Sequence, residues 1–136
     1  MKQISLGNGF EMSAKRTRKR AFLEEMERVV PWTELVAQIV PHMPPGKTGR
    51  PPYPAELLLR IHFLQQWFGL SDPAMEEALY DVPLYRQFAG LDLGNRGVPD
   101  ESTLLRFRHL LEEHKLAAKM LLVINTTLAA QGLMLR

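Results

Sequence analysis

The chain has 136 residues, a length typical of one ordinary domain that buries a core without disulfides or metals. It contains no cysteine, which excludes a disulfide framework, thiolate metal sites and a cysteine nucleophile. The formal net charge is only +2, but residues 1–50 carry nine basic and five acidic side chains, whereas residues 51–136 carry eight basic and ten acidic ones.

The hydrophobic pattern predicts a compact all-α domain of about six helices. Apolar residues recur at spacings of three and four, as on one face of an amphipathic helix, and no useful alternating strand pattern is present. Proline and glycine separate the helical segments. The expected helices, one of which has only one or two turns, cover residues 18–30, 32–40, 55–68, 71–80, 83–88, 101–114 and 116–130.

Two further segments differ in composition from the helices. Residues 1–17 are expected to form a basic N-terminal arm ahead of a single helical domain at 18–136. Residues 41–54 hold six prolines and two glycines, which predicts a linker rather than a regular element.

The segment 55–68 is the clearest helix. Glu56 and Arg60 have the i,i+4 spacing of an ion pair, and we expect this pair on the outer, polar side. The opposite side is apolar and is expected to face the core through Leu57, Leu58, Ile61, Leu64 and Phe68.

The basic run at 15–20 contains five Lys or Arg side chains in six positions. Cations that contact phosphates release condensed counterions and so strengthen DNA binding. The run is either an arm that orders on DNA or the solvated start of a helix. The candidate DNA contacts in it are Lys15, Arg16, Arg18, Lys19 and Arg20.

The proline-rich segment adds two candidate cations, Lys47 and Arg50. The sequence Gly46-Lys47-Thr48 lacks the first glycine of a phosphate-binding loop, because position 41 is Pro41, and it lacks the preceding strand, which excludes nucleotide binding. Gly49-Arg50-Pro51 is similar to extended arms that insert an arginine into the minor groove, and a rigid spacer is the alternative interpretation.

The segment 71–114 has the elements of a helix-turn-helix with a longer connection than usual. Asp100 is a good N-cap for its last helix, whose first turns present hydroxyl and guanidinium groups. Hydroxyls bind phosphates and arginine binds guanine bidentately. The alternative is a solvated face on which Arg108 pairs with Glu112. The candidate DNA contacts are Ser102, Thr103, Arg106, Arg108 and His109.

Neither catalysis nor metal binding is expected. His62, His109 and His114 lie in predicted helices without an aligned nucleophile or acid, and the last two are five residues apart rather than four. The paired glutamates are typical of helix surfaces and do not indicate the converging carboxylates of a two-metal site. We expect no catalytic residue, metal ligand, cofactor or small-molecule substrate.

The last helix, 116–130, has Lys119 as its only charge. The charge-free stretch 120–135 is too short and too polar to span a bilayer, and no signal peptide is present, so we expect a cytoplasmic, chromosome-associated protein. The wide apolar arc of the helix 116–130 either completes the core of the domain, or it is exposed and forms a homodimer through residues 116–135.

Several stretches along residues 10–136 are similar to a known family. The most specific is Pro99-Asp100-Glu101-Ser102-Thr103-Leu104-Leu105-Arg106-Phe107-Arg108, and the others are Lys15–Lys19, Val30-Pro31-Trp32, Gly49–Pro54, Leu59–His62, Leu70-Ser71-Asp72, Met75–Tyr80 and Phe88–Leu91. Taken in their order along the chain, these stretches resemble the N-terminal region of bacterial insertion-sequence transposases, in the class founded on insertion sequence five.

The resemblance implies a helical region that binds double-stranded DNA at the element's terminal inverted repeats. In that family an Asp-Asp-Glu catalytic domain of ribonuclease-H type follows, and Mg²⁺ belongs to that domain. The chain ends before the first catalytic aspartate is expected, so we expect a non-catalytic transposase domain. The alternative function is a protein-interaction or dimerisation module, or an inhibitor of the full-length transposase.

Overall fold

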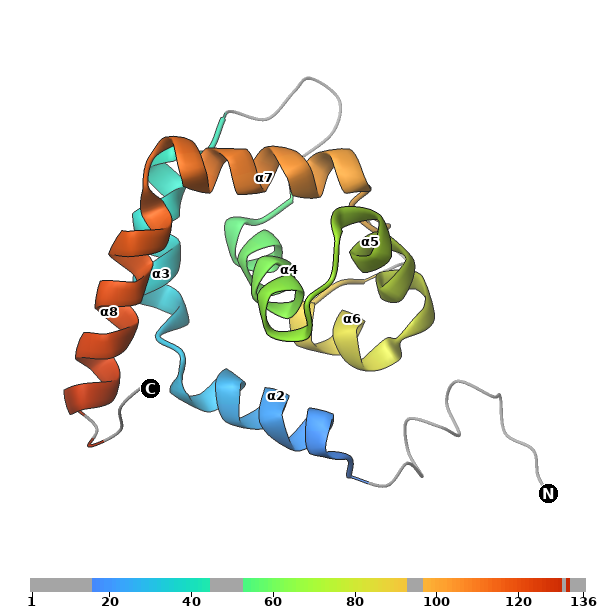
Figure 1. Cartoon of the computed structure of the whole chain (residues 1–136), viewed down its shortest axis with the longest axis horizontal. Coiled ribbons are helices and arrows are strands. Elements are labelled where there is room, and N and C mark those ends of the chain that lie inside the picture. Colours follow the sequence, from blue (N-terminus) through green and yellow to red (C-terminus); the bar gives the residue numbers. More distant parts are fainter. Residues whose placement is uncertain (1–15, 45–52, 93–96, 131, 133–136) are drawn as a thin grey trace.

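The computed structural model describes residues 16–44, 53–92, 97–130 and 132. Within these ranges it contains helices and no strand, which confirms the all-α prediction (Figure 1). Seven α-helices are described there, close to the expected number of about six. They are α2 (Arg18–Val29), α3 (Trp32–Ile39), α4 (Ala55–Phe68), α5 (Asp72–Asp81), α6 (Pro83–Ala89), α7 (Glu101–Glu113) and α8 (Leu116–Ala130), with a 3-10 helix η1 (Val40–His42) after α3.

Several helix ends lie where the sequence provides capping groups. The side chains of Thr17, Ser71 and Asp100 each accept a hydrogen bond from the backbone N–H three residues later, at the starts of α2, α5 and α7. Gly69 ends α4 with a φ of 65°, a left-handed conformation that glycine adopts without strain. Local signals therefore predicted these boundaries correctly.

The helical path continues further into the proline-rich segment than expected. Pro41 and His42 belong to η1, which follows α3 directly, because proline is tolerated in a first helical turn where its missing N–H is not needed. The predicted linker therefore begins after His42 rather than at Pro41. Residues 45–52, and with them Lys47 and Arg50, lie outside the described part of the chain.

Helix α4 lies at the centre and is buried on most sides. It packs against α3, α5, α6 and α7, and Leu59, Ile61 and Leu64 are fully buried. The predicted pair between Glu56 and Arg60 is confirmed by a 2.9 Å contact from Nε to Oε2. Its expected surface position is wrong, because groups from α2 and α6 meet the Arg60 guanidinium and leave this residue only 8% exposed.

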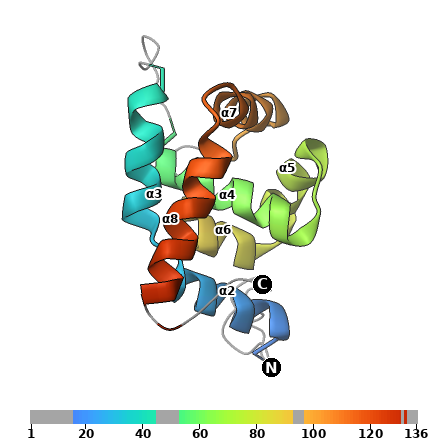
Figure 2. The same ribbon diagram turned by 60° about the vertical axis from the view of Figure 1, so that its left-hand side comes forward.

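The other helices surround α4 and leave α2 and α7 at opposite ends of the domain (Figures 1 and 2). Helices α3 and α8 pack side by side along one edge, while α5 packs against both α6 and α7. None of the described helices has the length and hydrophobicity that a membrane span requires. The start of α2 and the exposed side of α7, which hold the candidate DNA contacts among the described residues, are thus separated by the helices around α4.

Candidate nucleic-acid interface

The first turn of α2 carries a cluster of arginines. Arg16, Arg18 and Arg20 lie on or immediately before this turn; the first two are exposed, and Arg20 is partly exposed. The turn contains no acidic residue. Arg16 pairs with Glu24 at 2.5 Å, and both side chains are more than half exposed. We call Arg16, Arg18 and Arg20 the α2 basic cluster; Lys15 lies outside the described residues.

Lys19 belongs to the same turn but contacts the protein itself. Its Nζ donates a 2.8 Å hydrogen bond to the hydroxyl of Tyr85 and lies 4.7 Å from the ring centroid of Phe68. The rings of Phe68 and Tyr85 stack on each other with centroids 5.6 Å apart. The lysine therefore ties α2 to α4 and α6, while the residue as a whole remains exposed.

Replacing Lys19 with methionine is expected to lower the free energy of unfolding by about 1 kcal/mol, because the hydrogen bond and the cation–π contacts are lost. The matched control is Arg18→Gln, a neighbouring exposed cation, which should leave stability within about 0.5 kcal/mol of the parent chain. Urea unfolding followed by circular dichroism measures both. Equal stabilities for the two variants would contradict the structural role of Lys19.

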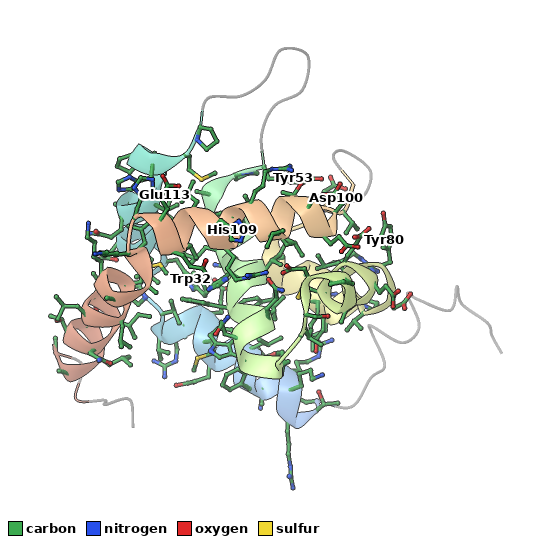
Figure 3. The ribbon with its side chains drawn as sticks, turned by 45° about the horizontal axis from the view of Figure 1, so that its top comes forward. Trp32, Tyr53, Tyr80, Asp100, His109 and Glu113 are labelled. Atoms are coloured by element: carbon green, nitrogen blue, oxygen red, sulfur yellow. The ribbon has the colours of Figure 1, made fainter. Side chains whose placement is uncertain are left out.

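Helix α7 presents a second set of candidates on its outer surface, where Figure 3 shows His109 midway along the helix. Ser102, Arg106 and His109 are exposed and share this side, and Thr103 is partly exposed. The Arg106 guanidinium donates a 3.3 Å hydrogen bond to the Thr103 hydroxyl. We call Ser102, Thr103, Arg106 and His109 the α7 outer face.

The N-terminus of α7 is already occupied by carboxylates. Asp100 accepts from the Thr103 N–H at 2.8 Å, and this backbone hydrogen bond is the main reason that the pKa of Asp100 is lowered. Glu76 on α5 accepts from the Glu101 N–H, also at 2.8 Å. A DNA phosphate would have to displace these groups to use the helix N-terminus.

Acidic side chains also flank the α7 outer face. Glu101, Glu112 and Glu113 are exposed on the same helix, and Arg106 is its one exposed arginine. Phosphate attraction is consequently weaker here than at the α2 basic cluster. The arrangement is better suited to reading base edges with a few hydrogen bonds than to gathering phosphates.

Arg108 does not pair with Glu112 as the alternative interpretation held. It donates to Asp72 at 2.5 Å, and the Asp72 side chain is only 12% exposed. Asp72 also accepts a 2.9 Å hydrogen bond from the Gln65 amide. This chain of contacts joins α7, α5 and α4, so Arg108 positions α7 within the domain.

The structure does not bring the two sets of candidates together. The α2 basic cluster lies at one end of the domain and α7 at the other, with α4, α5 and α6 between them (Figures 1 and 2). Helices α5 and α7, the predicted pair of the helix-turn-helix segment, do pack against each other. The short helix α6 lies between them in the chain. The two sets of candidates therefore form two separate surfaces rather than one site.

Histidines and carboxylates do not converge on a metal site in the part of the chain that is described. His62 belongs to α4, and its ring lies near the rings of Phe63 on the same helix and Phe107 on α7. Burial, with a smaller contribution from the charge of Arg108, lowers the pKa of His62 to about 4. It is therefore a neutral, packed side chain at pH 7.

Besides the contacts of Lys19 and Arg108, the sequence patterns missed two further long-range contacts. Arg60 stacks on Trp32 at 4.2 Å while bonding to Glu27, 33 residues away. His42 and His114 stack with their ring centroids 4.1 Å apart, which joins η1 to the turn between α7 and α8. Helix periodicity has no information on partners so distant in the chain, so no local signal could have found them.

Comparison with known proteins gives one family. The model of a family described as "Transposase domain (DUF772)" matches residues 10–110, a range that includes α2 to α6 and ends within α7. No solved structure matches the chain. Helix α8 lies beyond the matched range.

Proposed function

Because the chain belongs to the DUF772 transposase domain family, we propose that it is a DNA-binding domain that recognises the terminal inverted repeats of an insertion sequence. The assignment to the insertion sequence five class is part of this proposal. The domain acts on double-stranded DNA at the chromosome and has no catalytic step of its own.

The observation that carries the proposal is the α2 basic cluster. Cations in the first turn of a helix oppose the helix dipole, so Arg18 and Arg20 do not stabilise α2 by their position. Arg16 and Arg18 are exposed at the surface. Exposed arginines are suited to phosphate contacts, which supply most of the sequence-independent affinity of DNA-binding proteins; Arg16 exchanges its ion pair with Glu24 for such a contact.

The two surfaces have different tasks in this proposal. The α2 basic cluster binds phosphates, and the α7 outer face reads bases, with Arg106 as the residue able to bind guanine bidentately. Since the surfaces lie at opposite ends of the domain, they contact different segments of DNA. Lys47 and Arg50 remain candidate contacts.

Fluorescence anisotropy with two duplexes tests DNA binding directly. One duplex carries the terminal sequence of the element that flanks the gene, and the other has the same composition in scrambled order. The parent chain is expected to bind the terminal duplex more tightly, with affinity falling steeply between about 50 and 200 mM salt. Equal affinity for both duplexes contradicts repeat recognition, and salt-insensitive or absent binding contradicts DNA binding altogether.

We also propose that Mg²⁺ binding and DNA strand cleavage belong to a separate catalytic domain. No trio of histidine, aspartate and glutamate side chains with metal-binding geometry occurs among the described residues. Incubation of the purified chain with the terminal duplex and Mg²⁺ is expected to leave both strands intact. Metal-dependent nicking that follows the protein through purification would overturn this assignment.

The second candidate function is an interaction module that inhibits the full-length transposase. The exposure of Leu121 and Leu122 on α8 favours it, because exposed apolar surface promotes association. An inhibitor of this kind lowers transposition without binding the terminal duplex. The anisotropy measurement therefore separates the two functions.

A further inference from the structure

Helix α8 has an apolar outer face that no described part of the chain covers. Its inner side packs against α3 and α7, with Leu116, Met120 and Leu128 buried. On its outer side Leu121 is 53% exposed and Leu122 is 68% exposed. Figure 1 shows α8 at the left-hand edge of the domain, and Figure 2 shows it beside α3. The surface lies outside the family match and plays no part in the proposed DNA contacts.

The outer face has the residue spacing of a helix-pairing seam. Ala118, Leu122, Asn125 and Ala129 follow one another at intervals of four, three and four residues, which places them in one line along α8. The first, second and fourth are exposed, and Asn125 is partly exposed with a buried Oδ1 that accepts no hydrogen bond from the described residues. Leu121 lies beside this line.

Charge favours a second copy of the chain as the partner. Lys119 is the only charged residue of α8. Two copies of the outer face therefore meet without repulsion between like charges if the two lysines are kept apart. A parallel pair would put Lys119 beside its own copy. In an antiparallel pair centred between residues 123 and 124, the two lysines are offset by about 13.5 Å along the axis, which exceeds the Debye length of about 8 Å at physiological salt.

We propose that α8 pairs with α8 of a second copy, antiparallel about a two-fold axis near residues 123 and 124. The register places Leu122 against Asn125 of the second copy and Ala118 against Ala129. Small residues at both ends let the helices approach closely, and the leucines fill the centre. The carboxamide of Asn125 gains polar partners across the axis once it rotates outward.

The size of the surface sets the strength of the pairing. A helix of 15 residues is about 22 Å long. One helix pair of this length lies at or below the lower limit of about 1,200 Å² for stable interfaces. The dimer is therefore weak and dependent on concentration, with a dissociation constant in the micromolar range.

Sedimentation velocity over a concentration series tests the pairing in the absence of DNA, so its result is independent of the DNA-binding proposal. The parent chain is expected to shift from monomer towards dimer, and the double variant Leu121→Ser, Leu122→Ser to associate at least about tenfold more weakly. The matched control is Tyr80→Ser, since Tyr80 is 58% exposed on α5. A parent chain that stays monomeric, or a double variant that associates as the parent does, overturns the proposal.

Cysteine cross-linking tests the orientation, because the chain has no cysteine of its own. Ala118→Cys and Ala129→Cys variants are expected to form disulfide-linked dimers rapidly when mixed and slowly when each is oxidised alone. Leu122→Cys, near the axis, should cross-link by itself. Faster cross-linking of each alanine variant alone than of the mixture would indicate a parallel pair and overturn the antiparallel register.

Discussion

Replacing Arg60 with alanine is expected to lower the free energy of unfolding by about 3 kcal/mol. The guanidinium donates to Glu27 and Glu56, at 2.5–2.9 Å, and at 3.0 Å to the carbonyl oxygen of Phe88. It also stacks on Trp32. Its removal breaks links among four helices and leaves the carbonyl without this donor. The two carboxylates are about half exposed and regain water, which keeps the loss from being larger.

Two conservative variants separate the contributions of Arg60. Lysine at this position keeps the charge but loses the planar fork and the stacking, so Arg60→Lys should lose roughly half as much stability as the alanine variant. Glu56→Gln removes one half-exposed partner and should lose less than about 1 kcal/mol. Urea unfolding measures all three, and an alanine variant within about 1 kcal/mol of the parent would contradict the network's importance.

The same network predicts a dependence on acid pH. The hydrogen bonds from Arg60 hold the pKa of Glu27 below its usual value, against a smaller opposing effect of burial. The stability from this pair is therefore complete above the ordinary glutamate pKa of about 4.3 and is lost as the pH falls through the lowered value. Arg60→Ala and Glu27→Gln should both reduce this acid-dependent loss relative to the parent chain.

Replacing Arg16, Arg18 and Arg20 together with glutamine is expected to reduce the salt dependence of DNA binding. Each lost phosphate contact lowers the slope of log affinity against log salt by about 0.9, so three lost contacts lower it by about 2 to 3. Affinity at low salt should fall at least about tenfold. Fluorescence anisotropy with the scrambled duplex is the appropriate measurement, because phosphate contacts do not depend on base sequence.

The matched control for the α2 basic cluster is Arg28→Gln at the other end of α2. Arg28 is as exposed as Arg16 and likewise pairs with a glutamate, Glu25. It should leave the slope unchanged. Arg106→Gln should instead reduce discrimination between terminal and scrambled duplexes by about 1–3 kcal/mol and change the slope by no more than about 1. A triple variant with the parent's slope would contradict phosphate binding by the α2 basic cluster.

Much of the local structure could be predicted from the sequence. The capping side chains of Ser71 and Asp100 and the glycine at 69 identified helix ends correctly. The position of α4 could not be predicted, because burial on nearly all sides depends on four neighbouring helices rather than on its own periodicity. For this reason the Glu56–Arg60 pair was predicted with the correct partners and the wrong environment.

In the candidate site, too, the sequence predicted candidate residues but not which partners they contact. The sequence identified the cations, but not that Lys19 contacts Tyr85, 66 residues away, or that Arg108 pairs with Asp72, 36 residues away. Such partners depend on how helices cross, and a linear pattern carries no information on crossing. The apolar composition of α8 was likewise evident, while its outward exposure at Leu121 and Leu122 depends on how it packs against α3.

The sequence by itself determined that this protein is helical, where most of its helices begin and end, and that its positive charge gathers near the N-terminus. These properties depend on capping, helical periodicity and composition, which act over a few residues. Only the tertiary structure decided that the basic cluster of α2 and the outer face of α7 lie at opposite ends of the domain. That separation arises because α4 and its neighbours form the core between them, and core packing joins residues that are far apart in the chain.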